Sequence, residues 1–153
     1  MSAEARLAEL GLELPSPPRP VANYVPAMRA GELLFLSGHG PLLPDGTRVK
    51  GRLGADLDVE QGREAARLTA LGLLATLRTE LGSLDRVAQI VKVLGLVRSA
   101  DDFADQPAVM NGCSDLLVEV LGEPGKHARS ALGVNELPQG MCVEIELIAK
   151  VAE

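Results

Sequence analysis

Apolar residues recur at steps of three and four through the middle of the chain, a spacing that places them on one side of an α-helix. Asp58 precedes this stripe as a candidate N-cap, and Gln61 stands three residues later in a variant of the capping box. Gly82 follows the last apolar residue and suits a helix end. The pattern predicts a helix over 58–81 that faces a core with Ala65, Leu68, Leu71, Leu74, Leu77 and Leu81.

Two further segments show helical spacing. One begins at Pro107, which suits a first helical turn, and ends at Leu121, where Gly122 follows. The other covers residues 3–10 near the start of the chain and stops at Gly11. We therefore expect three helices, of which the first is short.

Strands are expected where β-branched and other apolar residues cluster between turn residues: 24–28, 32–37, 86–97, 129–135 and 141–151, with a weak strand near 48–50. This order predicts an α+β fold, a single domain in which a β-sheet carries the two longer helices on one face. Apolar residues occupy both faces of the strands, so the other face of the sheet also needs a cover. Self-association is the simplest cover, and we expect an oligomer.

The first part of the chain differs in composition from the rest. Four prolines fall within residues 15–20, and proline excludes helix and favours an extended backbone. We assign residues 1–20 to an N-terminal helix and a proline-rich arm, and residues 21–153 to one domain.

Composition narrows the possible functions. The net charge is −6, and the chain has two Phe, one Tyr and no Trp, which disfavours a nucleic-acid partner. We expect no membrane segment and no secretion signal, since no run approaches about 20 apolar residues, and the cytoplasm is the default location. Cys113 and Cys142 fit no metal-binding spacing and are interpreted as buried, reduced thiols. We expect no metal site and no cofactor, because His39 and His127 lie in loops as solvated or backbone-bonded residues and no nucleotide-binding motif is present.

Several candidate functional residues lie in the C-terminal part of the sequence. If residues 138–139 formed a tight hairpin turn, Arg129 would lie opposite Ile148 and would share a face with Glu144 and Glu146. Such a set is either a surface ion network of small energetic weight or the wall of a ligand cleft. In a cleft, the guanidinium would bind a carboxylate through two parallel hydrogen bonds, and a glutamate would move a proton or orient a water.

Two earlier segments are further candidates. The segment Ser37-Gly38-His39-Gly40 would let a backbone N–H approach a ligand oxygen, because glycine adds no bulk. Tyr24 would offer a hydroxyl, although a packing role explains a tyrosine near a strand equally well.

Several motifs resemble those of the RidA (YjgF) family of enamine/imine deaminases, formerly called endoribonuclease L-PSP. The C-terminal motif is His127-Ala128-Arg129-Ser130, then Leu137-Pro138, then Val143-Glu144-Ile145-Glu146. The segment Leu36 to Pro41 resembles the family's early Ser-Gly-Gln motif. Single residues also match, namely Tyr24, Asp102, Phe103 and Asn111. The resemblance covers roughly residues 20–151.

The resemblance implies a chorismate-mutase-like fold and a homotrimer, a trimeric barrel with ligand clefts between subunits. It implies that Arg129 holds the carboxylate of a short 2-imino or 2-enamino acid, which is hydrolysed to a 2-keto acid and ammonium without a cofactor. Glu144 would position water or move a proton, a backbone group near Gly38 would orient the ligand, and Tyr24 would form part of the wall. The expected substrate-binding residues are Arg129, Tyr24, Gly38, His39 and Asn111.

Three positions depart from the family pattern. Ala131 stands where many members have cysteine, His39 replaces the usual glutamine, and Ser114 replaces an aromatic residue. These departures and the N-terminal arm suggest a divergent subgroup of longer chains. Two alternatives stay open: a non-catalytic module that binds small carboxylates such as 2-keto acids, and an endoribonuclease or translation inhibitor. The acidic charge and the scarcity of aromatic residues disfavour the second alternative.

Overall fold

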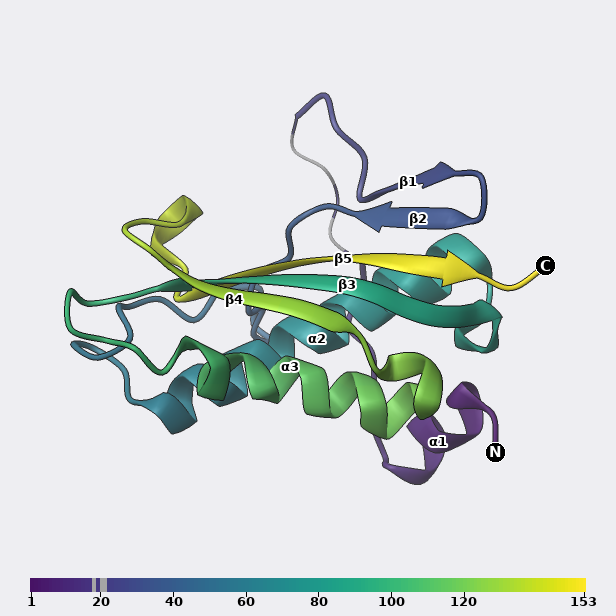
Figure 1. Ribbon diagram of the computed structural model, residues 1–153, viewed down its shortest axis with the longest axis horizontal. Coiled ribbons are helices and arrows are strands. Elements are labelled where there is room, and N and C mark those ends of the chain that lie inside the picture. Colours follow the sequence, from purple (N-terminus) through teal and green to yellow (C-terminus); the bar gives the residue numbers. More distant parts are fainter. Residues whose placement is uncertain (18, 20–21) are drawn as a thin grey trace.

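The computed structural model describes residues 1–17, 19 and 22–153 (Figure 1). The main elements, in chain order, are α1 (Ala3–Glu9), β1 (Ala27–Ala30), β2 (Leu33–Leu36), α2 (Val59–Leu81), β3 (Val87–Arg98), α3 (Gln106–Leu121), β4 (Ala128–Val134) and β5 (Val143–Val151). Three short 3-10 turns, η1 (Leu84–Arg86), η2 (Glu123–Gly125) and η3 (Pro138–Gly140), connect them.

Most predicted elements are present with small shifts of their ends. The strand expected over 24–28 lies at 27–30, and the weak strand near 48–50 is reduced to single bridges from Arg48 to Leu42 and from Lys50 to Met141. The predicted cap of α2 is confirmed, because Asp58 and Gln61 form a reciprocal capping box and Gly82 ends the helix at φ 81°.

The strands form one mixed sheet in the order β1-β2-β5-β3-β4. β3 and β4 are parallel, since α3 connects them as a crossover helix, and the other neighbours are antiparallel. The predicted hairpin between the last two strands is wrong, because β3 lies between them. Val93 pairs with Arg129 on one side and with Leu147 on the other, so Arg129 does not lie opposite Ile148.

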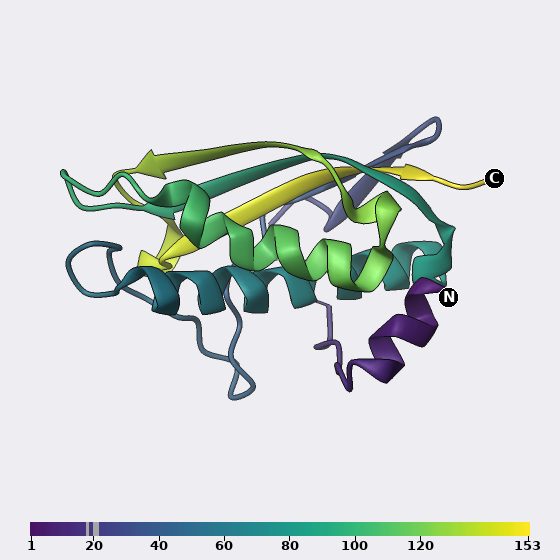
Figure 2. The same cartoon turned by 60° about the horizontal axis from the view of Figure 1, so that its bottom comes forward.

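Helices α2 and α3 cover one face of the sheet, as predicted (Figure 2). The core lies between these layers, and its fully buried side chains include Leu73, Leu77, Leu116, Ile90 and Ile145. Cys113 and Cys142 belong to the same core as free thiols, which confirms the prediction for them. Burial raises the pKa of Cys113 to about 12, so this thiol stays protonated and unreactive.

Helix α1 docks at one end of the core. Ser2 caps the helix, and the side chains of Ala3 and Leu7 are buried. The Leu84 backbone N–H donates to the Glu4 carboxylate at 2.9 Å. The predicted proline-rich arm follows α1, and its residues 18 and 20 lie outside the described part of the chain, as does residue 21.

The opposite face of the sheet has no helix over it within the described residues (Figure 2). Register places Phe35 beside Ile148, and Leu96 beside Leu132, on this face. Phe35 is 41% exposed and Leu132 is 52% exposed, so the face presents apolar side chains to solvent. None of the described helices is long and apolar enough to cross a membrane.

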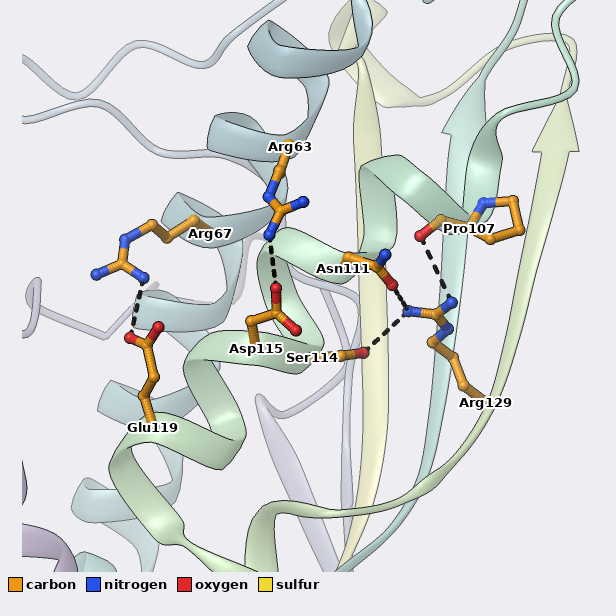
Figure 3. Close-up of polar contacts among 8 residues, drawn as sticks. All are labelled: Arg63, Arg67, Pro107, Asn111, Ser114, Asp115, Glu119 and Arg129. Atoms are coloured by element: carbon orange, nitrogen blue, oxygen red, sulfur yellow. Dashed lines mark hydrogen bonds and ion pairs between the residues drawn. The ribbon is translucent and has the colours of Figure 1, made fainter.

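α2 and α3 approach each other closely at Gly112. A side chain there would collide with the backbone carbonyl of Arg63. Outside this contact the helices are linked by ion pairs, Arg63 to Asp115 at 2.6 Å and Arg67 to Glu119 at 3.4 Å (Figure 3). These pairs are exposed and add little stability. The absence of a side chain at Gly112 is therefore what sets the helix spacing.

Replacing Gly112 by Ala is expected to lower the free energy of unfolding by about 1–3 kcal/mol, because the added methyl group overpacks the helix interface. Urea unfolding curves with an unchanged m value measure this loss. The matched control is Gly72→Ala in α2, where the nearest atom to an added Cβ lies 3.7 Å away. That variant should be more stable than wild type by up to about 1 kcal/mol, through helix propensity. A Gly112→Ala protein as stable as the Gly72→Ala protein would contradict the steric explanation.

Candidate functional site

Arg129 lies on the edge strand β4 and points toward the helices, because its register partner Val93 faces the core. Its Nη1 donates to the Asn111 carboxamide oxygen at 2.9 Å and to the Ser114 hydroxyl at 3.1 Å (Figure 3). Its Nη2 makes a long contact of 3.5 Å with the Pro107 carbonyl. No carboxylate of the described residues forms an ion pair with Arg129. The half-buried guanidinium is therefore oriented by uncharged groups and keeps its positive charge for an anionic ligand.

His127 supports this arrangement from behind Ser114. Its Nδ1 lies 2.6 Å from the Gly125 carbonyl oxygen, and its Nε2 lies 2.9 Å from the Ser114 hydroxyl. This fits a neutral ring that donates through Nδ1 and accepts the Ser114 proton at Nε2, which leaves a Ser114 lone pair for Arg129. Burial, and then the charge of Arg129, lower the pKa of His127 and favour that neutral form. The backbone-bonded interpretation of His127 is confirmed.

Glu144 lies on β5 and packs against Gly38. A Cβ built on Gly38 would lie 2.9 Å from the Glu144 carboxyl carbon, so only glycine leaves room for the carboxylate. Burial, and then the neighbouring Glu146, raise the pKa of Glu144 above the ordinary value of 4.5. A carboxyl group with a raised pKa is suited to taking and returning a proton near neutral pH.

Tyr24, Gly38 and His39 line one cavity of about 190 Å³. Tyr24 is 51% exposed at its rim. The His39 ring is buried, with Nε2 2.7 Å from the Thr76 hydroxyl and Nδ1 2.6 Å from the Ser37 carbonyl oxygen. Both nitrogens are therefore engaged. His39 is backbone-bonded as expected, but it is not solvated.

The predicted site residues form two groups in a single chain. Arg129 pairs across the sheet with Val93, which pairs in turn with Leu147, and these three side chains lie on the face that the helices cover. Glu144 pairs with Leu96, and both side chains lie on the opposite face. The prediction that Arg129, Glu144 and Glu146 share a face is therefore wrong; of these three residues, only the two glutamates share a face. The error came from the assumed hairpin, because the inserted strand β3 changes which residues lie side by side. Asn111 belongs to the Arg129 group, and Gly38 contacts Glu144. Tyr24 and His39 line the cavity beside Gly38, with the His39 ring directed toward α2.

Sequence reasoning missed the roles of Ser114 and His127. Ser114 was noted only as a departure from an aromatic residue. The available signal was spacing, because residues 127 and 129 are two apart at the start of a strand and so point the same way. Among the described residues, no group of three or more His, Cys, Asp or Glu side chains could hold a metal ion.

Residues 4–151 match a family model described as "YjgF/chorismate mutase-like, putative endoribonuclease". "Protein TCP17" from Trypanosoma cruzi is 41% identical over 148 residues, which is 96% of this chain and 92% of the relative. The crystal structure of the protein Atu1372 from Agrobacterium tumefaciens superposes with a TM-score of 0.90 at 40% identity, and the match covers 99% of this chain and 92% of that one. A protein from Dermatophagoides farinae named 2-iminobutanoate/2-iminopropanoate deaminase is 28% identical over 92% of this chain and 94% of its own length.

The buried His39 makes stability depend on pH. Burial lowers its pKa below the ordinary 6.5, so the unfolded chain takes up a proton before the folded chain does as the pH falls. The free energy of unfolding should therefore decrease as the pH drops from about 7 through the ordinary histidine pKa of about 6.5. His39→Gln is expected to flatten this decrease, and urea unfolding of both proteins across this pH range measures it. Equal pH slopes for the two proteins would contradict the assignment, and His127→Gln controls for the second histidine.

Proposed function

The chain belongs to the YjgF/RidA family, and from that premise we propose that it hydrolyses short 2-imino acids and their 2-enamino tautomers to 2-keto acids and ammonium. The observation that carries this proposal is the Arg129 guanidinium, held by Asn111 and Ser114 with no described carboxylate to neutralise it. A fixed cation of this shape suits a small carboxylate bound through two parallel hydrogen bonds. The name of the Dermatophagoides relative gives the reaction class for a member of the family.

The proposed reaction needs only water and proton transfers. Water adds to the C=N carbon and gives up a proton, and the nitrogen takes up a proton, which forms a carbinolamine. The C–N bond then breaks, the hydroxyl loses its proton and becomes the keto oxygen, and ammonia leaves and is protonated to ammonium. Glu144 takes the proton from water and returns it to nitrogen, a role for which its raised pKa is suited. No external oxidant or reductant enters this balance.

Arg129 and Glu144 lie on opposite faces of the sheet, so one ligand can touch both only between two copies of the chain. We propose a homotrimer in which the open sheet faces form the interior of a barrel, and in which Arg129 of one copy faces Gly38 and Glu144 of the next. The exposed apolar side chains of Phe35 and Leu132 support this, because a monomer would leave them in water. Tyr24 at the rim of its cavity would then form part of the wall.

Arg129→Ala is expected to lower kcat/KM for 2-iminopropanoate by roughly 100-fold, because it removes two charge-assisted hydrogen bonds to the carboxylate. Glu144→Gln should lower kcat by about 100-fold or more while leaving 2-keto acid binding nearly unchanged. An amino-acid oxidase that generates the imine in a coupled assay measures both. The control is Arg67→Gln, an arginine on the outer surface of α2.

Several outcomes separate the alternatives. Wild type that binds 2-keto acids without accelerating imine hydrolysis would contradict catalysis and leave a carboxylate-binding module. Full activity in Glu144→Gln would remove Glu144 from the mechanism. An Arg129→Ala protein that is unfolded by circular dichroism would make this arginine structural.

Leu132→Asp is expected to break the assembly, because it places a charge on the apolar sheet face. Light scattering after size-exclusion chromatography should give wild type three times the chain mass of 16.1 kDa and the variant a smaller mass. Activity should fall with the assembly. Leu10→Asp is the matched control, because Leu10 is similarly exposed, at 45%, at the end of α1. A monomeric and active wild type would contradict the shared site.

A further inference from the structure

The cavity beside Gly38 carries charge that the proposed reaction does not use. Arg48 lines it from the segment after β2, and Arg19 lines it from the N-terminal arm. None of the described residues that line this cavity is an aspartate or a glutamate. In a chain with a net charge of −6, this is a local concentration of positive charge.

Arg48 is a cation without a carboxylate partner in the described part of the chain. The Arg48 side chain lies close to Gly40, since a Cβ added there would be 3.3 Å from the Arg48 Nε. The charge of Arg48 also helps to lower the pKa of His39. The side chain is partly buried and forms no ion pair with any carboxylate among the described residues. Five other arginines, in contrast, each pair with a glutamate or an aspartate, namely Arg52, Arg63, Arg67, Arg78 and Arg98. An arginine in a cavity without an acidic neighbour suits an anion from outside.

Backbone N–H groups also lie beside the cavity that Arg48 lines. The N–H groups of Ser37 and His39 donate to the carbonyls of Pro26 and Ile145. The N–H groups of Gly38 and Gly40 donate to no acceptor among the described residues. Free N–H groups at bare glycine positions beside an arginine are typical of sites that bind an anionic oxygen.

We propose that this cavity receives a second carboxylate of the substrate, at Arg48, so that the preferred substrates are 2-imino acids whose side chain ends in a carboxylate. The inference rests on the proposed function, which places the reacting end of the substrate at Gly38. Gly38 and Gly40 are two residues apart, roughly 7 Å along an extended chain, a span that a short dicarboxylic acid can bridge. The N-terminal arm then has a role, because Arg19 lines the cavity together with Pro15 and Ser16.

The test compares two ligands of equal carbon-chain length that differ in the distal carboxylate, 2-oxoglutarate and 2-oxopentanoate. Calorimetric titration of the wild-type assembly should give a Kd for 2-oxoglutarate at least about tenfold lower than for 2-oxopentanoate. Arg48→Gln should remove this preference by weakening 2-oxoglutarate alone. Arg67→Gln, outside the cavity, should leave both constants unchanged.

Three outcomes would overturn the inference: equal affinity of wild type for the two ligands, an equal loss of both in Arg48→Gln, or phosphate binding that depends on Arg48 and coexists with bound 2-oxoglutarate. The last would make the cavity a separate anion site. The coupled assay distinguishes this failure from failure of the proposed function. With imines made from glutamate and from norvaline, Arg48→Gln should lose activity on the first and keep it on the second. Hydrolysis of neither imine by wild type would instead reject the deaminase.

Discussion

Strand β3 pairs along both of its edges, and the positions of Arg129 and Glu144 depend on that pairing. It holds β4 on one side in parallel and β5 on the other in antiparallel orientation. Buried residues such as Val93 and Val97 fix which face of the strand meets the helices. Through the shared register, that choice turns Arg129 toward α3 and turns Glu144 to the opposite face. A change of one residue in the pairing of β4 would move Arg129 off α3 and separate it from Asn111 and Ser114.

The two groups of residues are prepared in different ways. Arg129 is held by hydrogen bonds to Asn111 and Ser114, and His127 orients the Ser114 hydroxyl. Glu144 is instead placed by steric space, because Gly38 leaves room for its carboxylate, whose pKa is raised by burial and then by Glu146. The first arrangement keeps a positive charge available, and the second places a carboxyl group that can exchange a proton. A hydrolysis that binds a carboxylate and moves protons needs both.

Local patterns predicted the helices well and the pairing of strands poorly. The α2 boundaries were readable because Asp58, Gln61 and Gly82 act on neighbouring backbone groups. The C-terminal pairing was not readable, because the turn after Leu137 resembles a hairpin while β3 comes from earlier in the chain and competes for the same strand edges. Arg129, Asn111 and Gly38 were found through motifs. His127 and Ser114 were not, because their contact joins a helix to the residue before β4, and only the two-residue spacing of His127 and Arg129 pointed to it. The sequence did not predict a ligand-binding role for Arg48, because that role depends on a cavity whose other lining residues are far away in sequence.

The uncharged support of Arg129 has a consequence for the energetics of folding. An arginine in an internal salt bridge is stabilised by the protein itself, and a ligand must displace that partner before it can bind. Arg129 has no such partner among the described residues, so a bound carboxylate is its first counterion. Every carboxylate that binds only the folded form adds to the free energy of unfolding, by about 2.7 kcal/mol when the ligand stands at 100 times its Kd. Under the proposed function, a carboxylate substrate would therefore act on the protein as a stabiliser of its fold.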